Sequence, residues 1–404
     1  MKDKVILHVD LNNFYASVEA ILNPALVGKA IAVCGDPDRR CGIVLAKSEP
    51  AKKMGVKTGD VIWQAKQKCP DIIIVPASHG VYGEYSKKVQ EIYCRYTERV
   101  EAFGGDECWL DVTDSLKLLK KNGREIADEI RSIVKSELGL SVSVGVSWNK
   151  TYAKLGSDYK KPDATTEITP DNYSDIVFAM PVANMLYVGR KSIRLFEKLG
   201  IKTIGDLAGF DVDLLRSHIG ITAVALIEAA RGEDNSQVAP YYHKRVVKSV
   251  GNGTTVPKDL VNQRQVEQVM YLLAEEVAYR LRKKGLKGFT VNLSIKSPDM
   301  SWVGAQESVK IATNSVNKIL QACSGILDKL WDRKPVRALR IAVSNLTSDT
   351  RQQLDFLEET VDSDKEDKLS ALFDTVRRKY GVNSIYYGIH HKSGHDMQFE
   401  VFDE

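Results

Sequence analysis

Near the start of the chain, the spacing of apolar residues is first that of a strand and then that of a helix. Residues 4–9 are almost continuously apolar, which is typical of a strand buried on both faces. The helical pattern at 14–22 stops before Pro24, because a residue that precedes proline avoids the helical conformation. The pattern then predicts a small α/β module with strands at 30–34 and 42–46, a short helix ending at Gly55 and another helix at 60–68.

A hairpin is predicted between residues 98 and 111. Two short apolar or β-branched runs flank Gly104-Gly105, and glycine tolerates the positive φ angles of a tight turn. A helix at 82–98 precedes the hairpin, and a helix at 124–138 and a strand at 141–146 follow it. Together with the first strand, these elements predict a ferredoxin-like sheet with helices on one face.

The remainder of the chain divides into a helical part, a linker, a second sheet module and a tail. Residues 181–233 are helical, and residues 234–242 are polar and aperiodic, which indicates a linker. Residues 246–345 predict a βαβ-type module with a first strand, a helix at 265–284, a strand at 289–296, a helix at 314–330 and a strand at 336–343. One more helix is predicted at 365–380.

Composition is that of a globular protein. Of 404 residues, 43% are hydrophobic and 27% are charged, and no apolar run is long enough to cross a bilayer. The six cysteines show no paired zinc spacing. Their scatter indicates buried thiols in a reducing cytoplasm, so we expect a cytoplasmic protein.

Charge is distributed unevenly, although the net charge is only +4. Residues 1–239 carry 32 basic and 32 acidic side chains, residues 240–345 carry 18 basic and 8 acidic, and residues 346–404 carry 7 basic and 13 acidic. A basic module followed by an acidic tail indicates a polyanionic partner. A solvated lysine-rich face is the alternative for the charge alone.

Three carboxylates are candidates for a metal site. Asp106 and Glu107 follow the glycine turn, and Asp10 ends the first strand, which lies beside the hairpin in the predicted topology. Carboxylate oxygens are the ligands that Mg²⁺ prefers. Because neighbouring residues of a regular strand point to opposite faces, both hairpin carboxylates serve only if the turn or a bulge bends one inward. A polar hairpin tip facing water is the alternative.

Two further features suit phosphate contacts. Lys161, in the loop before Pro162, is the better candidate of its region for binding a triphosphate beside a metal, although solvated helix lysines are unremarkable. Glycine turns at Gly189-Arg190 and at Gly220 open helices and present backbone N–H groups to phosphate. This is the helix-hairpin-helix pattern of DNA-backbone binding, and ordinary helical hairpins are the alternative.

Several of these motifs occur in the order known from one family. Residues 8–19 (HVDLNNFYASVE) are similar to its first metal motif and residues 104–113 (GGDECWLDVT) to its second. Residues 143–147 (SVGVS) and Lys160-Lys161-Pro162 follow in the expected places. From residue 8 to about 345, the chain resembles Y-family translesion DNA polymerases of the DNA polymerase IV and UmuC-like kind.

The resemblance implies an α+β multidomain fold shaped like a right hand. Its parts are a ferredoxin-like palm, small α/β fingers, a helical helix-hairpin-helix thumb and an α/β little-finger domain. The implied bounds are 1–10 and 79–166 for the palm, 11–78 for the fingers, 167–235 for the thumb, 236–243 for a linker, 244–345 for the little finger and 346–404 for an acidic tail.

The resemblance also implies the reaction, which adds dNTPs to a primer 3′ end past damaged template bases. Low fidelity follows, and no proofreading is expected. The implied site residues are Asp10, Asp106, Glu107 and the Leu11 carbonyl for two Mg²⁺ ions, Tyr15 as a steric gate with Phe14, Lys52 and Lys161 for the nucleotide, and Gly189, Arg190 and Gly220 for the DNA backbone.

The chain departs from the family pattern in the fingers and at the hairpin. Many members carry Tyr and Arg as triphosphate contacts where this chain has Glu49 and Lys52. Lys52 lacks the bidentate geometry of arginine, and Glu49 repels phosphate unless it turns away or pairs with a lysine. Ile43 and Leu45, over the nascent base pair, are bulkier than in some relatives, so we expect a narrower lesion range. Gly104-Gly105 replaces the usual Ser-Ile type of pair.

The tail contains a segment that resembles a sliding-clamp-binding motif, formed by Gln353, Leu354, Asp355, Phe356 and Leu357. The expected partners are primer-template DNA, dNTPs and a sliding clamp, with no membrane, for a monomeric chain. Two alternatives stay open. The signature Gly104-Gly105-Asp106-Glu107 imitates that of palm-fold nucleotidyl cyclases, and a catalytically weak homologue only binds DNA.

Overall fold

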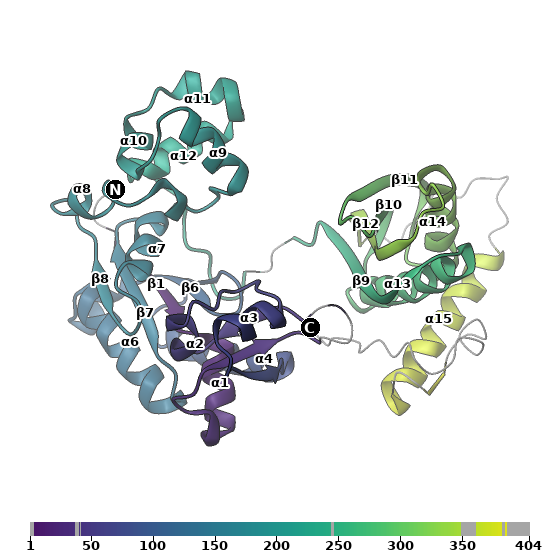
Figure 1. The fold of residues 1–404 in the computed structure, drawn as a ribbon, viewed down its shortest axis with the longest axis horizontal. Helices are drawn as coiled ribbons and strands as arrows, with labels where there is room; N and C mark the ends of the chain where they lie inside the picture. The colour runs from purple at the N-terminus through teal and green to yellow at the C-terminus, as the bar shows by residue number, and fades with distance from the viewer. Residues whose placement is uncertain are drawn as a thin grey trace. The chain divides into compact units, whose positions relative to one another are not determined.

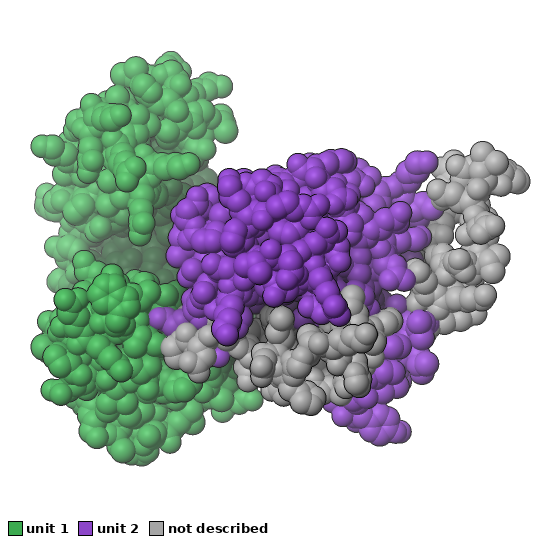
Figure 2. All heavy atoms as spheres, turned by 45° about the vertical axis from the view of Figure 1, so that its right-hand side comes forward, with its two compact units in different colours: residues 1–35, 43–244 green, residues 36–42, 245–404 purple. Residues whose placement is uncertain are grey.

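The chain folds as two compact units, one of residues 1–35 and 43–244 and the other of residues 36–42 and 245–404 (Figure 2). The structure, a computed structural model, describes residues 4–36, 40, 42–243, 246–348, 361–381 and 384–385, with secondary structure alone for 361–368. The clamp-like segment 353–357 lies outside the described residues.

The first unit is built on a five-stranded sheet with the strand order β5-β6-β1-β7-β8 (Figure 1). Its strands are β1 (Ile6–Leu11), β5 (Val100–Ala102), β6 (Glu107–Asp111), β7 (Val142–Ser147) and β8 (Thr165–Glu167). The first four pair antiparallel in the ferredoxin-like order, as predicted. The parallel edge strand β8 was not predicted, because its three residues are too few to show a period.

The two faces of this sheet have different covers. Leu7 and Val9 face the main core, to which the helices α1 (Phe14–Leu22), α4 (His79–Tyr93) and α6 (Gly123–Leu138) contribute. His8 and Asp10 point the other way, toward α7 (Lys150–Tyr159). The prediction of helices on one face only was therefore wrong. A Cβ at Gly145 would lie 1.9 Å from the carbonyl oxygen of Ala153, so only glycine lets α7 approach β7 this closely.

A smaller three-stranded sheet has the order β3-β2-β4. Its elements are β2 (Ile31–Cys34), β3 (Val44–Lys47) and β4 (Ile73–Pro76), with the helices α2 (Glu49–Lys53) and α3 (Ile62–Lys68). The α/β character was predicted, but β4, which is parallel to β2, was not. Short connecting elements are the 3-10 helix Pro24–Leu26 and α5 (Ser115–Leu119).

The predicted helical region forms a compact cluster around the fully buried ring of Phe196. Its elements are α8 (Tyr173–Ile176), the 3-10 helix Val182–Asn184, α9 (Arg190–Lys198), α10 (Ile204–Gly209), α11 (Val212–Ile219) and α12 (Thr222–Ala230). The end of α12 is tied to α7, because the Tyr152 hydroxyl donates to the Ala230 carbonyl at 2.9 Å. Asn149 Nδ2 likewise donates to the Gly232 carbonyl at 3.0 Å.

The segment predicted as a linker is packed against the five-stranded sheet over much of its length. Val238 is only 2% exposed and shares a small core with Trp109. The backbone N–H of Ala239 donates to the Glu101 carboxylate at 2.9 Å, and that of Tyr241 donates to the Glu98 carbonyl at 2.9 Å. The polar composition of the segment did not indicate this contact, because a single buried valine, Val238, anchors it.

The second unit holds a four-stranded sheet with the order β11-β10-β12-β9, in which all neighbours are antiparallel. Its elements are β9 (Ser249–Leu260), α13 (Gln263–Lys283), β10 (Lys287–Lys296), β11 (Trp302–Thr313), α14 (Val316–Leu330) and β12 (Val336–Thr347). The prediction of a βαβ-type module missed β11. This edge strand is largely exposed and lacks an apolar alternation.

A last helix, α15 (Val361–Tyr380), lies beside α13 (Figure 1). Arg282 of α13 donates to both carboxylate oxygens of Asp374, at 2.7 and 2.9 Å, and Arg377 pairs with Glu275 at 2.8 Å. None of the helices in the described part of the chain is long and apolar enough to cross a membrane.

Candidate active site

The end of β1 and the start of β6 bring three carboxylates together. Asp10 is the register partner of Glu107, and the Leu11 N–H donates to the Asp106 carbonyl at 2.9 Å. Asp106 precedes the first residue of β6, so the strict alternation of a strand does not separate it from Glu107. The topology predicted from the sequence is therefore the one that joins these residues.

Two lysines lie among the carboxylates. Lys154 Nζ, on α7, is 3.2 Å from Asp10 Oδ2 and 2.9 Å from Glu107 Oε1. Lys161 Nζ is 2.6 Å from Asp10 Oδ2 and 2.7 Å from Asp158 Oδ1. Burial opposes the charge of both lysines, but the surrounding carboxylates outweigh it and raise the pKa of each. The sequence favoured Lys161 alone, whereas the structure gives Lys154 the more central position.

His8 lies beside Glu107 on the face of the sheet that α7 covers. It is fully buried, with Nδ1 2.8 Å from Ser157 Oγ and Nε2 3.2 Å from Glu107 Oε2. Burial lowers the pKa of His8. Burial alone would raise the pKa of Glu107, but its contacts with His8 and Lys154 hold it below its usual range. Nε2 and Glu107 Oε2 form no hydrogen bond, so Lys154 rather than His8 is the residue that orients an ionised Glu107.

Asp106 differs from its two neighbours because it forms no ion pair with a basic residue among those described. Partial burial of its carboxylate, followed by the charges of Asp10 and Glu107, raises its pKa to about 6. An uncompensated carboxylate beside two others fits a hard divalent cation. Among the described residues, no three His, Cys, Asp or Glu side chains are close enough together to hold a metal ion as they stand. The ammonium group of Lys154 contacts the Glu107 carboxylate instead.

Tyr15 lies on the side of this cluster that faces α4. Its ring stacks on Tyr82 with centroids 4.1 Å apart and planes 12° apart, and it meets His79 edge-on at 6.0 Å. Burial, followed by the charge of Asp106, raises the pKa of the Tyr15 phenol. The adjacent Phe14 is only 3% exposed and packs in the main core.

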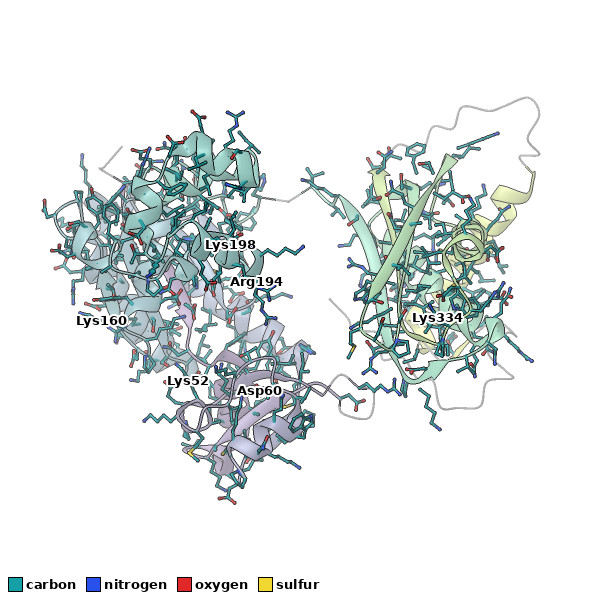
Figure 3. The ribbon with its side chains drawn as sticks, turned by 45° about the horizontal axis from the view of Figure 1, so that its top comes forward. Lys52, Asp60, Lys160, Arg194, Lys198 and Lys334 are labelled. Carbon is teal, nitrogen blue, oxygen red and sulfur yellow. The ribbon has the colours of Figure 1, made fainter. Side chains whose placement is uncertain are left out.

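A pocket opens beside Asp10. It is lined by residues from β1, the small sheet and the loop after α7, namely Asp10, Asn12, Asn13, Lys47, Glu49, Lys52, Lys161 and Pro162. Glu49 Oε1 lies 3.4 Å from Lys52 Nζ, so Glu49 pairs with a lysine here (Lys52 is labelled in Figure 3). Lys47 is a pocket residue that the sequence did not single out. Ile43 is 40% exposed and bridges to Val61, and Leu45 is partly exposed within β3.

The candidate DNA-backbone contacts lie on the helical cluster. Gly189 directly precedes α9, and Arg190 is the first residue of that helix. Arg194 and Lys198 follow at one-turn intervals and are also exposed (Figure 3). Gly220 ends α11 with a φ of 68° and stands two residues before α12. The two glycine turns are thus solvent-exposed, as a phosphate contact requires.

Two family models match the chain. Residues 9–158 match the impB/mucB/samB family, and residues 247–356 match the C-terminal domain of the impB/mucB/samB family. The first match includes all three carboxylates and Lys154, and it ends just before Lys161.

Curated relatives match almost the whole length. The chain is 45% identical to a DNA polymerase IV of Acetivibrio thermocellus, over 96% of this chain and 97% of that one. It is 34% identical to DNA polymerase IV 2 of Bacillus subtilis, over 95% of this chain and 94% of that one. Among solved structures, a Y-family DNA polymerase chimera is similar in fold, with a TM-score of 0.74 and 24% identity over 84% of this chain and 98% of that one.

Proposed function

The chain belongs to the impB/mucB/samB family and is a Y-family translesion DNA polymerase, and we propose that it adds dNTPs to a primer 3′ end past damaged template bases with low fidelity and without proofreading. The observation that carries this proposal is the meeting of Asp10, Asp106 and Glu107 at the end of β1. Nucleotidyl transfer needs mainly positioning and charge neutralisation, which such a cluster supplies once it holds cations.

Divalent metal is the cofactor that this site fits, and two Mg²⁺ ions are our proposal. Asp10, Asp106, Glu107 and the Leu11 carbonyl would hold them, and the uncompensated charge of Asp106 supports that role. Bound there, the ions would neutralise the triphosphate and activate the primer hydroxyl. The protein itself contributes orientation, since Lys154 holds Glu107, and Lys161, which pairs with Asp10 at the pocket, would bind the triphosphate.

Tyr15 is proposed as the steric gate against ribonucleotides. Two observations support this role: stacking on Tyr82 fixes the plane of the ring, and the charge of Asp106, a proposed metal ligand, acts on its phenol. A ring held rigidly by a stacked neighbour excludes the 2′ hydroxyl of a ribonucleotide better than a mobile ring does. The buried Phe14 has no such access and supports the gate from the core.

The DNA contacts are also proposals. The turns at Gly189-Arg190 and Gly220 would bind the backbone, and the basic excess of residues 240–345 gives the part of the chain with the four-stranded sheet the charge that a DNA-binding module needs. Ile43 and Leu45 would cover the nascent base pair. We further infer a monomer that binds a sliding clamp through residues 353–357.

Primer extension tests the proposal. Purified chain with Mg²⁺, dNTPs and a primer annealed to an undamaged or damaged template should extend the primer, and Asp106→Ala should abolish extension. Asp114→Ala is the matched control, because Asp114 is exposed and lies beyond β6, away from the cluster. Wild-type chain that binds the template without extending it would contradict the proposal.

The cyclase alternative is tested in the same experiment. Incubation with nucleoside triphosphates and no primer should give no cyclic product. The match of residues 247–356 to the family's C-terminal domain already favours the polymerase, since a cyclase has no need of that module.

A further inference from the structure

The pocket beside Asp10 contains three lysines whose partners differ. Lys161 is paired with Asp10 and Asp158, and Lys52 is paired with Glu49. Lys47 instead donates to the Thr58 hydroxyl at 3.0 Å and makes no ion pair with a carboxylate of the described residues. It is therefore the pocket lysine whose ammonium group is not in direct contact with a carboxylate, although the charges of Glu49 and Asp60 act on it from a longer distance.

The position of Lys47 suits a fixed binding residue. It is the last residue of β3, where it pairs with Ala32 of the neighbouring strand, so its backbone belongs to a sheet and not to a loop. Burial, followed by the charge of Lys52, lowers the pKa of Lys47. A half-buried ammonium group under these conditions is stabilised by an anion.

We propose that Lys47 binds the triphosphate of the incoming nucleotide and supplies the contact that Glu49 prevents Lys52 from making. This inference rests on the proposed polymerase function of the same site. A template backbone phosphate has the same chemistry, but Lys47 shares its pocket with Asp10 and Lys161, which favours the nucleotide.

Single-nucleotide incorporation measures the effect. Lys47→Met should raise the KM for dNTP about tenfold, which is the size of a lost charge-assisted hydrogen bond, and change kcat less than about threefold. Lys47→Arg keeps the charge and should restore most of the affinity. Lys53→Met is the matched control, since Lys53 is an exposed lysine on the adjoining helix α2 outside the pocket, and its KM should equal that of the wild type.

Glu49 provides a second, independent arm. Glu49→Gln removes the partner of Lys52 and should lower the KM for dNTP. In the double variant Lys47→Met/Glu49→Gln, the freed Lys52 replaces the missing charge, so the KM should return close to the wild-type value. A merely structural loss at Lys47 would not be corrected by a change at Glu49.

The outcomes separate the two proposals. If the wild type does not extend a primer, the proposed function fails. If the wild type extends the primer, two results would show that the inference about Lys47 is wrong. One is a KM for dNTP that is the same in Lys47→Met and Lys53→Met. The other is a Lys47→Arg variant whose KM for dNTP stays as high as that of Lys47→Met. The inference is also wrong if Lys47→Met weakens the Kd for primer-template DNA and leaves the KM for dNTP unchanged, because the ammonium group then contacts the template.

Discussion

The ammonium group of Lys154 lies 2.9 Å from Glu107 Oε1 and, on its other side, contacts Asp10. A buried lysine is thus the internal counter-ion of the carboxylate cluster that we propose as the metal site. Removal of one partner from a buried ion pair leaves an unpaired charge, which is strongly destabilising.

We therefore expect Lys154→Met to lower the free energy of unfolding by about 3 kcal/mol in EDTA. Saturating Mg²⁺ should recover at least half of that loss, because a bound cation replaces the missing charge. The measurement is urea denaturation of each variant with EDTA and with Mg²⁺.

Lys150→Met is the control for this experiment. Lys150 is on the same helix and pairs with Glu101 at 2.8 Å, with a similarly low side-chain exposure of 12% against 10% for Lys154. Its loss of stability should be the same with and without Mg²⁺. A Lys154→Met loss that is equally insensitive to Mg²⁺ would contradict the counter-ion role.

The pKa of Asp106 predicts a pH dependence of stability without metal. The folded-state pKa of about 6 exceeds the ordinary value of 3.8, so the folded protein binds more protons between these two values. Stability therefore falls as the pH rises from about 4 to about 6, by up to about 1 kcal/mol after screening, since the residue is exposed.

Asp106→Asn should remove this contribution. Thermal denaturation in EDTA should show the variant to be more stable than the wild type at pH 7.5, with the difference gone at pH 4. An equal difference at both pH values would show that the Asp106 charge is not its cause.

The stacking of Tyr15 on Tyr82 leads us to expect that the bulk of the Tyr15 ring determines discrimination against rNTPs. Tyr15→Ala should raise the ratio of rNTP to dNTP incorporation at least about tenfold, because the bulk beneath the sugar is gone. Tyr15→Phe keeps the ring and should leave that ratio unchanged. The test is single-nucleotide incorporation with dNTP and rNTP, and an unchanged ratio for Tyr15→Ala would exclude the gate.

Gly145 predicts a large effect on stability, because α7 lies directly on β7 at this residue. A Cβ there would overlap the Ala153 carbonyl oxygen, so Gly145→Ala should cost about 3 kcal/mol or more by forcing α7 away from β7. Gly105→Ala is the control, because nothing lies within 4 Å of a Cβ at Gly105 and its φ is not positive. Urea denaturation compares the two, and equal stabilities would contradict the close packing.

The sequence predicted the fold where elements are long and periodic. The first strand, the helix at 14–22 and the ferredoxin-like order followed from apolar patterns. Three strands were not predicted. β8 has only three residues, and β11 is an exposed edge whose polar side chains show no alternation. β4 is as long as the predicted strands β2 and β3, so its length does not explain why it was missed.

The site was predicted where chemistry and topology point to the same place. Asp10 and the hairpin carboxylates could be joined by strand order alone, whereas Lys154 could not, because a lysine within a helix usually faces solvent. Small residues at Gly145 and Ala153 are the available signal that α7 lies tightly on the sheet and turns Lys154 inward. Lys47 could not be predicted, because its importance depends on which neighbouring lysines already form ion pairs with carboxylates.

The packing of the segment around Val238 shortens the free chain that connects the first unit to β9. Tyr241 is the last residue held to the first unit by a backbone hydrogen bond within that segment, and β9 begins at Ser249. A fully extended chain between these two residues spans at most about 30 Å. Because this connection is covalent and short, the local concentration of each unit near the other stays high at any dilution.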